Sequence, residues 1–165
     1  MSTVLRRLLL LLILMFWQGG FMFYGAVVVP VGSEVLSSHR EQGFVTRSVT
    51  NYLNGAGTLC LVVWCWDIIQ ERHAALKWNR LRWLVWGFLV ATLAIQGWLH
   101  LRLDELLDPK TFLIIDGAQF SHLHQWYLIL STIQWGCAIV LTGLTIWSWK
   151  ESDAVVNRQP VTQEL

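Results

Sequence analysis

Residues 16–30 read FWQGGFMFYGAVVVP and complete an apolar run that begins at Leu8. The run is too long for a buried helix of a soluble domain, and its length suits a helix that spans a bilayer. No cleavage site of small residues follows the leucine-rich beginning, so we interpret residues 8–29 as an uncleaved first span rather than a signal peptide. Pro30 and Gly32 are expected to end this span.

The composition of the whole chain also indicates a membrane protein. Of its 165 residues, 55% are hydrophobic and only 14% are charged, and the mean hydropathy is +0.47. A formal net charge of +1 provides no concentrated basic surface, which argues against a nucleic-acid partner. Cys60, Cys65 and Cys137 lie in apolar runs, and their spacing is that of neither a disulfide framework nor a chelating site. The first partner that the sequence predicts is the lipid bilayer.

Three further apolar stretches predict three further spans, over about residues 48–69, 83–101 and 122–149. We therefore expect an all-α membrane protein, a four-transmembrane-helix bundle within residues 1–149. Residues 31–47 are polar and are expected to form a loop with a short interfacial helix, and residues 111–115 a strand-like or interfacial segment. The polar residues 150–165 are expected to form a cytoplasmic tail without order.

The connection between the second and third spans indicates the orientation of the chain. Residues 70–82 carry Arg72, Lys77, Arg80 and Arg82 against Glu71 as the single acid. By the positive-inside rule this connection is cytoplasmic, and with four spans both termini lie on the same side, N-in and C-in. The sequence therefore predicts a multi-pass protein of the inner (plasma) membrane. Six tryptophans would then form an aromatic belt at the cytoplasmic interface, namely Trp64, Trp66, Trp83, Trp86, Trp147 and Trp149.

Polar side chains inside the predicted spans gather in the outer half of the membrane, whereas the inner half has almost nothing comparable. They are Tyr24, Asn51, Asn54, Gln96, Tyr127 and Ser131, with Gln18 and Gln134 beneath them near the midplane. Since an unpaired polar group is costly in hydrocarbon, these side chains should face one another or water. Either these side chains form interhelical hydrogen bonds, worth roughly 0.6 kcal/mol each, or they form a seam that binds a small ligand or a partner helix. Asp67, at the inner end, is interpreted as a snorkelling or arginine-paired acid.

A haem- or metal-binding redox protein is the first alternative function. His100 and His124 lie at matching heights at the outer ends of the third and fourth spans, and imidazole binds haem iron, copper and zinc. The second alternative is a small transporter, which would require a homo-oligomer because Trp17 and Trp135 leave little room for a pore within one bundle. The sequence contains neither a nucleophile elbow nor a phosphate-binding glycine loop, which favours a protein that is not an enzyme.

The first hairpin carries a pattern of glycine, aromatic and proline residues. It reads Trp17-x-Gly19-Gly20-x-x-Phe23-Tyr24-x-x-Val27-Val28-x-Pro30, followed by Gln42-Gly43 and Val49-x-x-x-Leu53-Asn54. This pattern resembles a bacterial four-helix membrane family of unknown function that is similar to eukaryotic transmembrane protein 205. The resemblance implies a four-helix integral membrane domain and brings no activity with it. The first span is also similar to that of four-helix haem-pathway oxidases and copper-resistance proteins, but Val31 and Gly32 stand where that pattern has an arginine and a histidine.

Overall fold

The structure is a computed structural model that describes residues 3–36, 39–71, 76–108 and 113–158. Its elements are α1 (Thr3–Phe23), the π turn η1 (Tyr24–Val28), α2 (Val29–Val35), α3 (His39–Gln70), α4 (Leu76–Glu105), β1 (Leu107–Asp108), β2 (Leu113–Ile114) and α5 (Gly117–Arg158). The strands pair antiparallel, with Leu107 opposite Ile114 and Asp108 opposite Leu113. Almost the whole described chain is therefore helical, as the sequence predicts.

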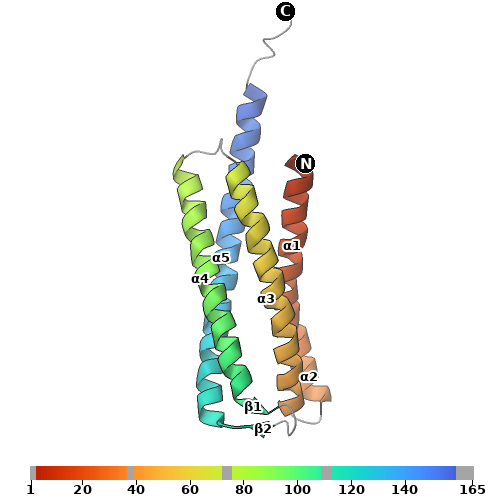
Figure 1. The fold of residues 1–165 in the computed structure, drawn as a ribbon. Coiled ribbons are helices and arrows are strands. Elements are labelled where there is room, and N and C mark those ends of the chain that lie inside the picture. Colours follow the sequence, from red (N-terminus) through yellow and green to blue (C-terminus); the bar gives the residue numbers. More distant parts are fainter. Residues whose placement is uncertain (1–2, 37–38, 72–75, 109–112, 159–165) are drawn as a thin grey trace, which may run out of the picture.

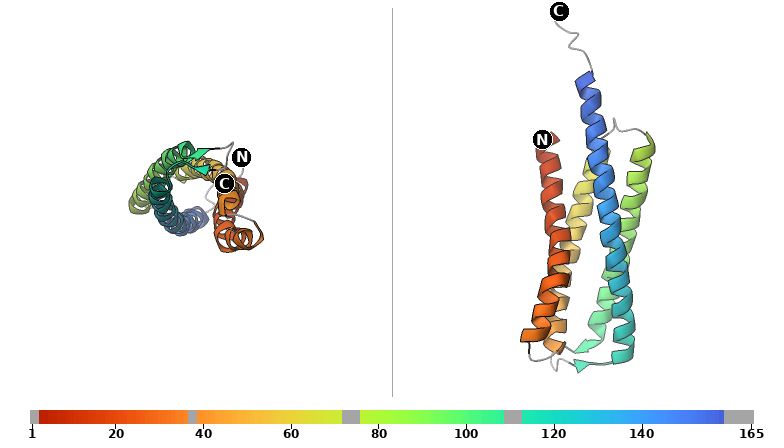
Figure 2. Two further views of the ribbon diagram at one scale, coloured as in Figure 1. Left: turned by 90° about the horizontal axis from the view of Figure 1, so that it is seen from below. Right: turned by 180° about the vertical axis from the view of Figure 1, so that it is seen from behind.

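The long helices run up and down beside one another (Figure 1). α1 packs along α3, α3 along α4, and α4 along α5, so that each helix mainly contacts its neighbours in the chain (Figure 2). The beginning of α1 and the end of α5 lie at one end of the bundle, which we call the terminal end. The β1–β2 hairpin lies at the other end, which we call the loop end.

Four helical stretches are long and apolar enough to cross a membrane: Thr3–Val35, Glu41–Gln70, Trp78–Glu105 and Gly117–Val155. Each contains one of the four predicted spans, so the prediction of four such helices is confirmed. Large apolar side chains cover their outer faces, among them Met15, Phe16 and Leu84, which are exposed in the isolated chain. Such a surface is typical of helices that face lipid.

The prediction that Pro30 ends the first helix is wrong, because the helix continues through α2 to Val35. In a regular α-helix the proline ring would clash with the carbonyl group four residues earlier, and proline has no N–H to donate. Here the turn before Pro30 is a π turn, in which the N–H of Val29 donates to the carbonyl oxygen of Tyr24. This wider turn accommodates the proline within the helix.

The predicted loop and tail are also shorter than expected. Within the predicted loop over residues 31–47, residues 31–35 belong to α2 and residues 39–47 to α3. α5 continues to Arg158, so residues 150–158 are helical rather than without order, and residues 159–165 lie outside the described residues. No proline or glycine interrupts this extension, and the indole N–H of Trp147 donates to Glu151 at 2.9 Å, one turn further on. The expected strand-like segment is confirmed at Leu113 and Ile114.

The hydrophobic core fills the terminal half of the bundle. Its buried residues are Leu10, Leu14, Trp17, Cys60, Leu61, Val63, Trp64, Ile68, Leu89, Ala138, Leu141 and Trp149. The contact between α1 and α3 depends on a glycine, since a Cβ atom at Gly57 would lie only 2.8 Å from Cε2 of Trp17. Glycine therefore lets the indole pack directly against the backbone of α3.

Candidate functional site

Four of the predicted site residues meet in the loop half, between α3, α4 and α5. The Tyr127 hydroxyl donates to Oδ1 of Asn54 at 3.2 Å. The Ser131 hydroxyl donates to the carbonyl oxygen of Tyr127 at 2.8 Å and accepts from Nε2 of Gln96 at 3.2 Å. These side chains bind one another and join three helices, which is the arrangement expected of interhelical hydrogen bonds rather than of an open seam.

The other four predicted residues do not hydrogen-bond to this group. The Tyr24 hydroxyl donates to Oγ1 of Thr46 at 2.7 Å and joins η1 to α3. Nε2 of Gln134 donates to Oγ1 of Thr92 at 3.5 Å. Oε1 of Gln18 is buried without a hydrogen-bond partner. Asn51 lies exposed on the outside of α3, so the structure brings together only half of the predicted set.

The two histidines proposed as cofactor ligands have different surroundings. His100 is buried beside Tyr127, with ring centres 6.5 Å apart, and its Nε2 lies 3.9 Å from Oδ2 of Asp104 without a hydrogen-bond partner. His124 instead stacks on Phe120 at 6.0 Å. In the described part of the chain, no group of three or more His, Cys, Asp or Glu side chains is placed to hold a metal ion. The haem alternative, which needs only two histidine ligands, stays a prediction.

An ion pair between α3 and α4 lies near His100 at the loop end. Nε of Arg47 lies 2.6 Å from Oδ1 of Asp104, and Nη2 of Arg47 donates to Oδ2 at 3.0 Å. This pair joins the loop-end part of α3 to α4.

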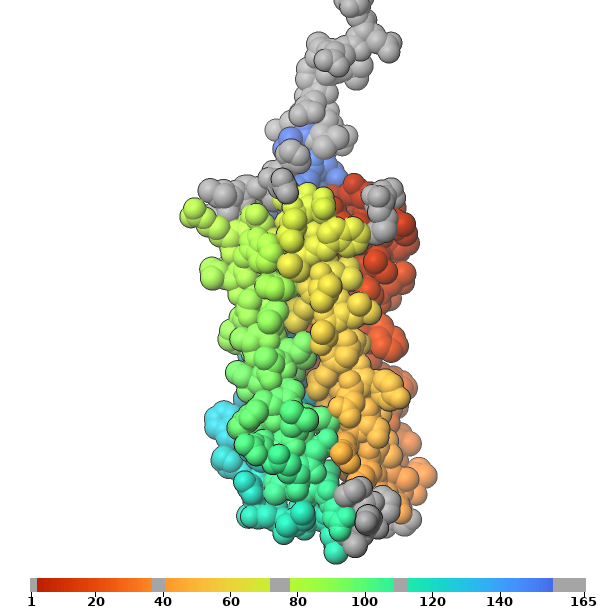
Figure 3. All heavy atoms as spheres, in the orientation of Figure 1, coloured from red at the N-terminus to blue at the C-terminus, as the bar shows by residue number. Residues whose placement is uncertain are grey.

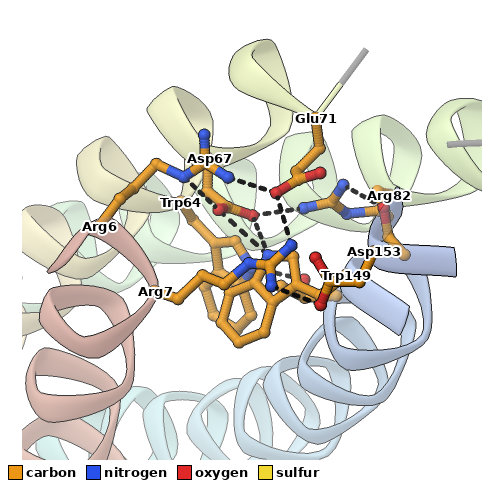
Figure 4. A network of polar contacts seen from close by, with 10 residues as sticks. Arg6, Arg7, Trp64, Asp67, Glu71, Arg82, Trp149 and Asp153 are labelled. Carbon is orange, nitrogen blue, oxygen red and sulfur yellow. Dashed lines mark hydrogen bonds and ion pairs between the residues drawn. The ribbon is translucent and has the colours of Figure 1, made fainter. Parts of the chain in front are cut away.

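The densest polar network lies at the terminal end and is centred on Asp67, which is fully buried (Figure 4). Nη2 of Arg82 donates to Oδ2 of Asp67 at 2.7 Å, and the indole N–H of Trp149 lies 3.2 Å from Oδ1 and 3.1 Å from Oδ2. Nε of Arg6 lies 3.0 Å from Oδ1 as an ion pair, although its N–H is not directed for a hydrogen bond. One carboxylate on α3 therefore contacts α1, α4 and α5.

Glu71 and Asp153 extend this network toward the end of the bundle. Glu71 accepts from Nη2 of Arg6 and, at 3.3 Å, from Nη2 of Arg7. Nη1 of Arg7 donates to Asp153 at 2.8 Å, and its guanidinium group lies 5.2 Å from the ring centre of Trp149. We call Arg6, Arg7, Asp67, Glu71, Arg82, Trp149 and Asp153 the terminal network. It joins α1 to α5, the first helix to the last.

Most of the terminal network lies just outside the predicted spans, since only Asp67 and Trp149 fall within them. The positive-inside rule uses Arg6, Arg7 and Arg82 only as charges that set the orientation, and their carboxylate partners lie far away in the sequence, Asp67 and Glu71 at the end of α3 and Asp153 on α5. The one usable signal was Asp67, an acid inside an apolar run, and the pairing with arginine predicted for it is confirmed.

A small hollow lies next to the terminal network, between α1 and α3. It has a volume of about 240 Å³ and is lined by Thr3, Arg6, Trp66 and Gln70. Arg6 thus takes part in both the network and the lining of the hollow. None of the four residues was predicted to belong to a site.

Comparison with protein-family models, with curated proteins and with solved structures finds no match to this chain. The resemblance of the first hairpin to the four-helix bacterial family stays a prediction. What the fold defines is a class: an all-α protein with four helices long and apolar enough to cross a membrane.

Proposed function

We propose that this chain is a multi-pass protein of the inner (plasma) membrane, N-in and C-in, that binds a partner transmembrane helix on the outward face of α3. The small-ligand seam that the sequence predicts is the second candidate. The outward face carries Ser48, Asn51, Tyr52, Gly55 and Thr58, all exposed in the isolated chain. Their spacing of three and four residues places them along one side of the helix.

The membrane part of the proposal is supported by the spacing of the two ionic layers. On α3, Arg47 and Asp67 are 20 residues apart, which corresponds to about 30 Å along a helix. The two partners on α4, Asp104 and Arg82, are 22 residues apart, or about 33 Å. Both separations match the thickness of the hydrocarbon core, so the ion pairs would lie at its two boundaries.

The observation that carries the partner-helix proposal is the contrast between two neighbouring glycines. Gly57 faces inward, against Trp17, whereas a Cβ atom at Gly55 would meet nothing within 4 Å. Among the described residues the amide of Asn51, one turn away, takes part in no hydrogen bond. A small residue beside an unpaired amide on a lipid-facing helix is typical of an interface between helices. Figure 3 shows that α3 is uncovered on the side toward the viewer, between α4 and α1.

Photocrosslinking in native membranes tests this proposal. A benzoylphenylalanine placed at Tyr52 should, on irradiation, give a crosslinked adduct that is larger than the chain by the mass of one partner protein. The same group at Trp98, an exposed residue of α4 at similar depth, is the matched control and should give none. An adduct of twice the chain mass would identify the partner as a second copy.

The variant Gly55→Leu sharpens this test, because its side chain enters space that is empty in the isolated chain. It should abolish the adduct at Tyr52 while the protein remains folded. Equal adducts at Tyr52 and Trp98, or an adduct that Gly55→Leu does not change, would contradict the proposal.

The small-ligand candidate is favoured by one observation, the buried Nε2 of His100 without a hydrogen-bond partner. A polar ligand bound there would supply that partner. Native mass spectrometry of the full chain from mild detergent tests this candidate. A retained mass that is lost in His100→Phe but kept in His122→Phe, a change at an exposed histidine, would support it. The absence of any such mass would remove it.

A further inference from the structure

We propose that the partner on the outward face of α3 is a second copy of this chain, whose own α3 packs against it in parallel about a two-fold axis along the membrane normal. This inference rests on the membrane insertion and the partner helix proposed above, and it names that partner. Three observations carry it: the spacing of the exposed residues of α3, the order of large and small residues among them, and two neighbouring polar groups without hydrogen bonds.

The first observation is a seven-residue repeat on the outward face of α3. Six residues at alternating steps of three and four are all exposed in the isolated chain. We call them the α3 seam, and they are Val45, Ser48, Tyr52, Gly55, Leu59 and Val62. Two parallel helices with such a repeat stay in contact along their length, since a slight supercoil keeps this period facing the partner.

The seam has the length and the charge that a pair of identical helices in a membrane requires. From its first to its last residue it advances 17 residues, or about 26 Å along the helix. That length is most of the thickness of the hydrocarbon core. None of the six residues is charged, so two identical seams do not repel one another.

The second observation is the order of large and small residues around Tyr52. The side chain of Tyr52 is 78% exposed, and its neighbours on the seam are the small residues Ser48 and Gly55. In a parallel pair, each seam side chain enters a hole formed by four residues of the facing helix. For Tyr52 these four are Ser48, Asn51, Tyr52 and Gly55 of the second copy. The two small residues leave room for the phenol ring, so the seam is complementary to itself.

The third observation is that two adjacent polar groups have no hydrogen bond among the described residues, the amide of Asn51 and the hydroxyl of Tyr52. They lie four and five residues from Arg47, or about 6–8 Å inside the proposed boundary of the membrane. An unbonded polar group is costly at that depth. An amide and a phenol hydroxyl both donate and accept, so each suits the other.

Two-fold symmetry forms this contact twice. Asn51 of each copy lines the hole that receives Tyr52 of the other, so one arrangement brings both amides beside both hydroxyl groups. A second copy therefore supplies the hole for the ring and the partners for both polar groups. The residues of this chain alone are sufficient for the interface.

Disulfide crosslinking of the full chain in native membranes tests this proposal, in a background whose three cysteines are replaced by alanine. With a mild oxidant, Ser48→Cys should give a species of twice the chain mass, because the seam brings its two Cα atoms within the roughly 7 Å that a disulfide allows. The matched control is Ser121→Cys, the same change at an exposed site of α5. Asn54 and Tyr127 are hydrogen-bonded and each lies six residues further on, so the two serines lie at similar depth. The control should give about tenfold less of the linked species.

A glycine variant shows whether the disulfide reports the packed seam. Gly55→Leu, added to Ser48→Cys, fills the hole for Tyr52 and should lower the linked fraction about tenfold. The matched control is Gly143→Leu, at an exposed glycine of α5 where a Cβ atom also meets nothing within 4 Å, and it should leave the linked fraction unchanged. Equal linkage from the two cysteine positions, or linkage that Gly55→Leu does not lower, would overturn the parallel pair.

The disulfide and the photoadduct at Tyr52 together separate this inference from the proposal on which it rests. A photoadduct of twice the chain mass together with the Ser48→Cys disulfide supports the parallel pair. A photoadduct with a protein of another mass, and no disulfide, would overturn the second copy and keep the partner helix. A photoadduct of twice the chain mass without the disulfide would overturn the parallel arrangement. The absence of both products would overturn the partner helix as well.

Discussion

At the scale of single residues, Asp67 is the side chain that connects the four long helices. Its carboxylate is fully buried and contacts groups on three other helices, Arg6, Arg82 and Trp149. A buried ion pair adds little over an apolar pair of the same shape, but removing one partner leaves the other charge uncompensated. Loss of the Asp67 carboxylate should therefore cost more stability than loss of any one hydrogen bond in the loop half, because it leaves Arg6 and Arg82 with less counter-charge.

The variant Asp67→Asn keeps the shape of this residue and removes its charge. We expect it to lower the free energy of unfolding by about 3–5 kcal/mol, because it leaves buried guanidinium groups short of a counter-charge. Titration with a denaturing detergent, followed by circular dichroism, measures this loss. The control is Glu105→Gln, whose ion pair with Arg102 is exposed and should be worth no more than about 1 kcal/mol. Equal effects of the two changes would show that the terminal network contributes no more than a surface ion pair.

At the scale of elements, the sequence predicted which segments are helices better than it predicted where they end. Apolar length alone identified the four spans, since only a long helix satisfies every backbone group in a membrane. Proline as a local signal predicts a helix end at Pro30, because that rule does not include the π turn that precedes it. The extension of α5 was missed for a similar reason, since its contact with the rest of the bundle comes from Arg7, which is 146 residues away in the chain.

The contact between α1 and α3 gives a prediction at this scale, from two glycines of one helix. In Gly57→Ala the new methyl group would lie 2.8 to 3.0 Å from atoms of the Trp17 ring, and the packed indole must shift. We expect a loss of about 1–3 kcal/mol from this overpacking. In Gly55→Ala the methyl group meets nothing within 4 Å, and the higher helix propensity of alanine should leave stability unchanged or raised by up to about 1 kcal/mol.

The same detergent titration compares the two variants. Because both replace glycine by alanine in the middle of α3, effects of backbone propensity cancel in the difference. A stability of Gly57→Ala equal to that of Gly55→Ala would mean that Trp17 does not pack against α3 as described.

At the scale of the whole molecule, the position of polar groups along the bundle explains which of them could be predicted from the sequence and which could not. The prediction that polar groups gather in the loop half was right for Asn54, Gln96, Tyr127 and Ser131, which share similar heights. The terminal network could not be predicted from the sequence, because its members lie between residues 6 and 153 and no local pattern connects them. The hollow beside it could not be predicted either, since a cavity depends on how two helices pack and not on their composition.

The last prediction concerns the orientation of the molecule in the membrane. In the sequence, the segments next to the helix ends of the terminal end (residues 1–7, 67–82 and 147–165) carry eight basic and five acidic residues. The segments next to the helix ends of the loop end (residues 30–47 and 102–116) carry four and six. By the positive-inside rule the terminal end is cytoplasmic.

In a background with Cys60, Cys65 and Cys137 replaced by alanine, a cysteine at Ser33, exposed on α2, should react with a membrane-impermeant maleimide added to intact cells. A cysteine at Ala154, exposed on α5, should react only after the cells are opened. Labelling of the Ala154 position in intact cells, with the Ser33 position protected, would reverse the orientation.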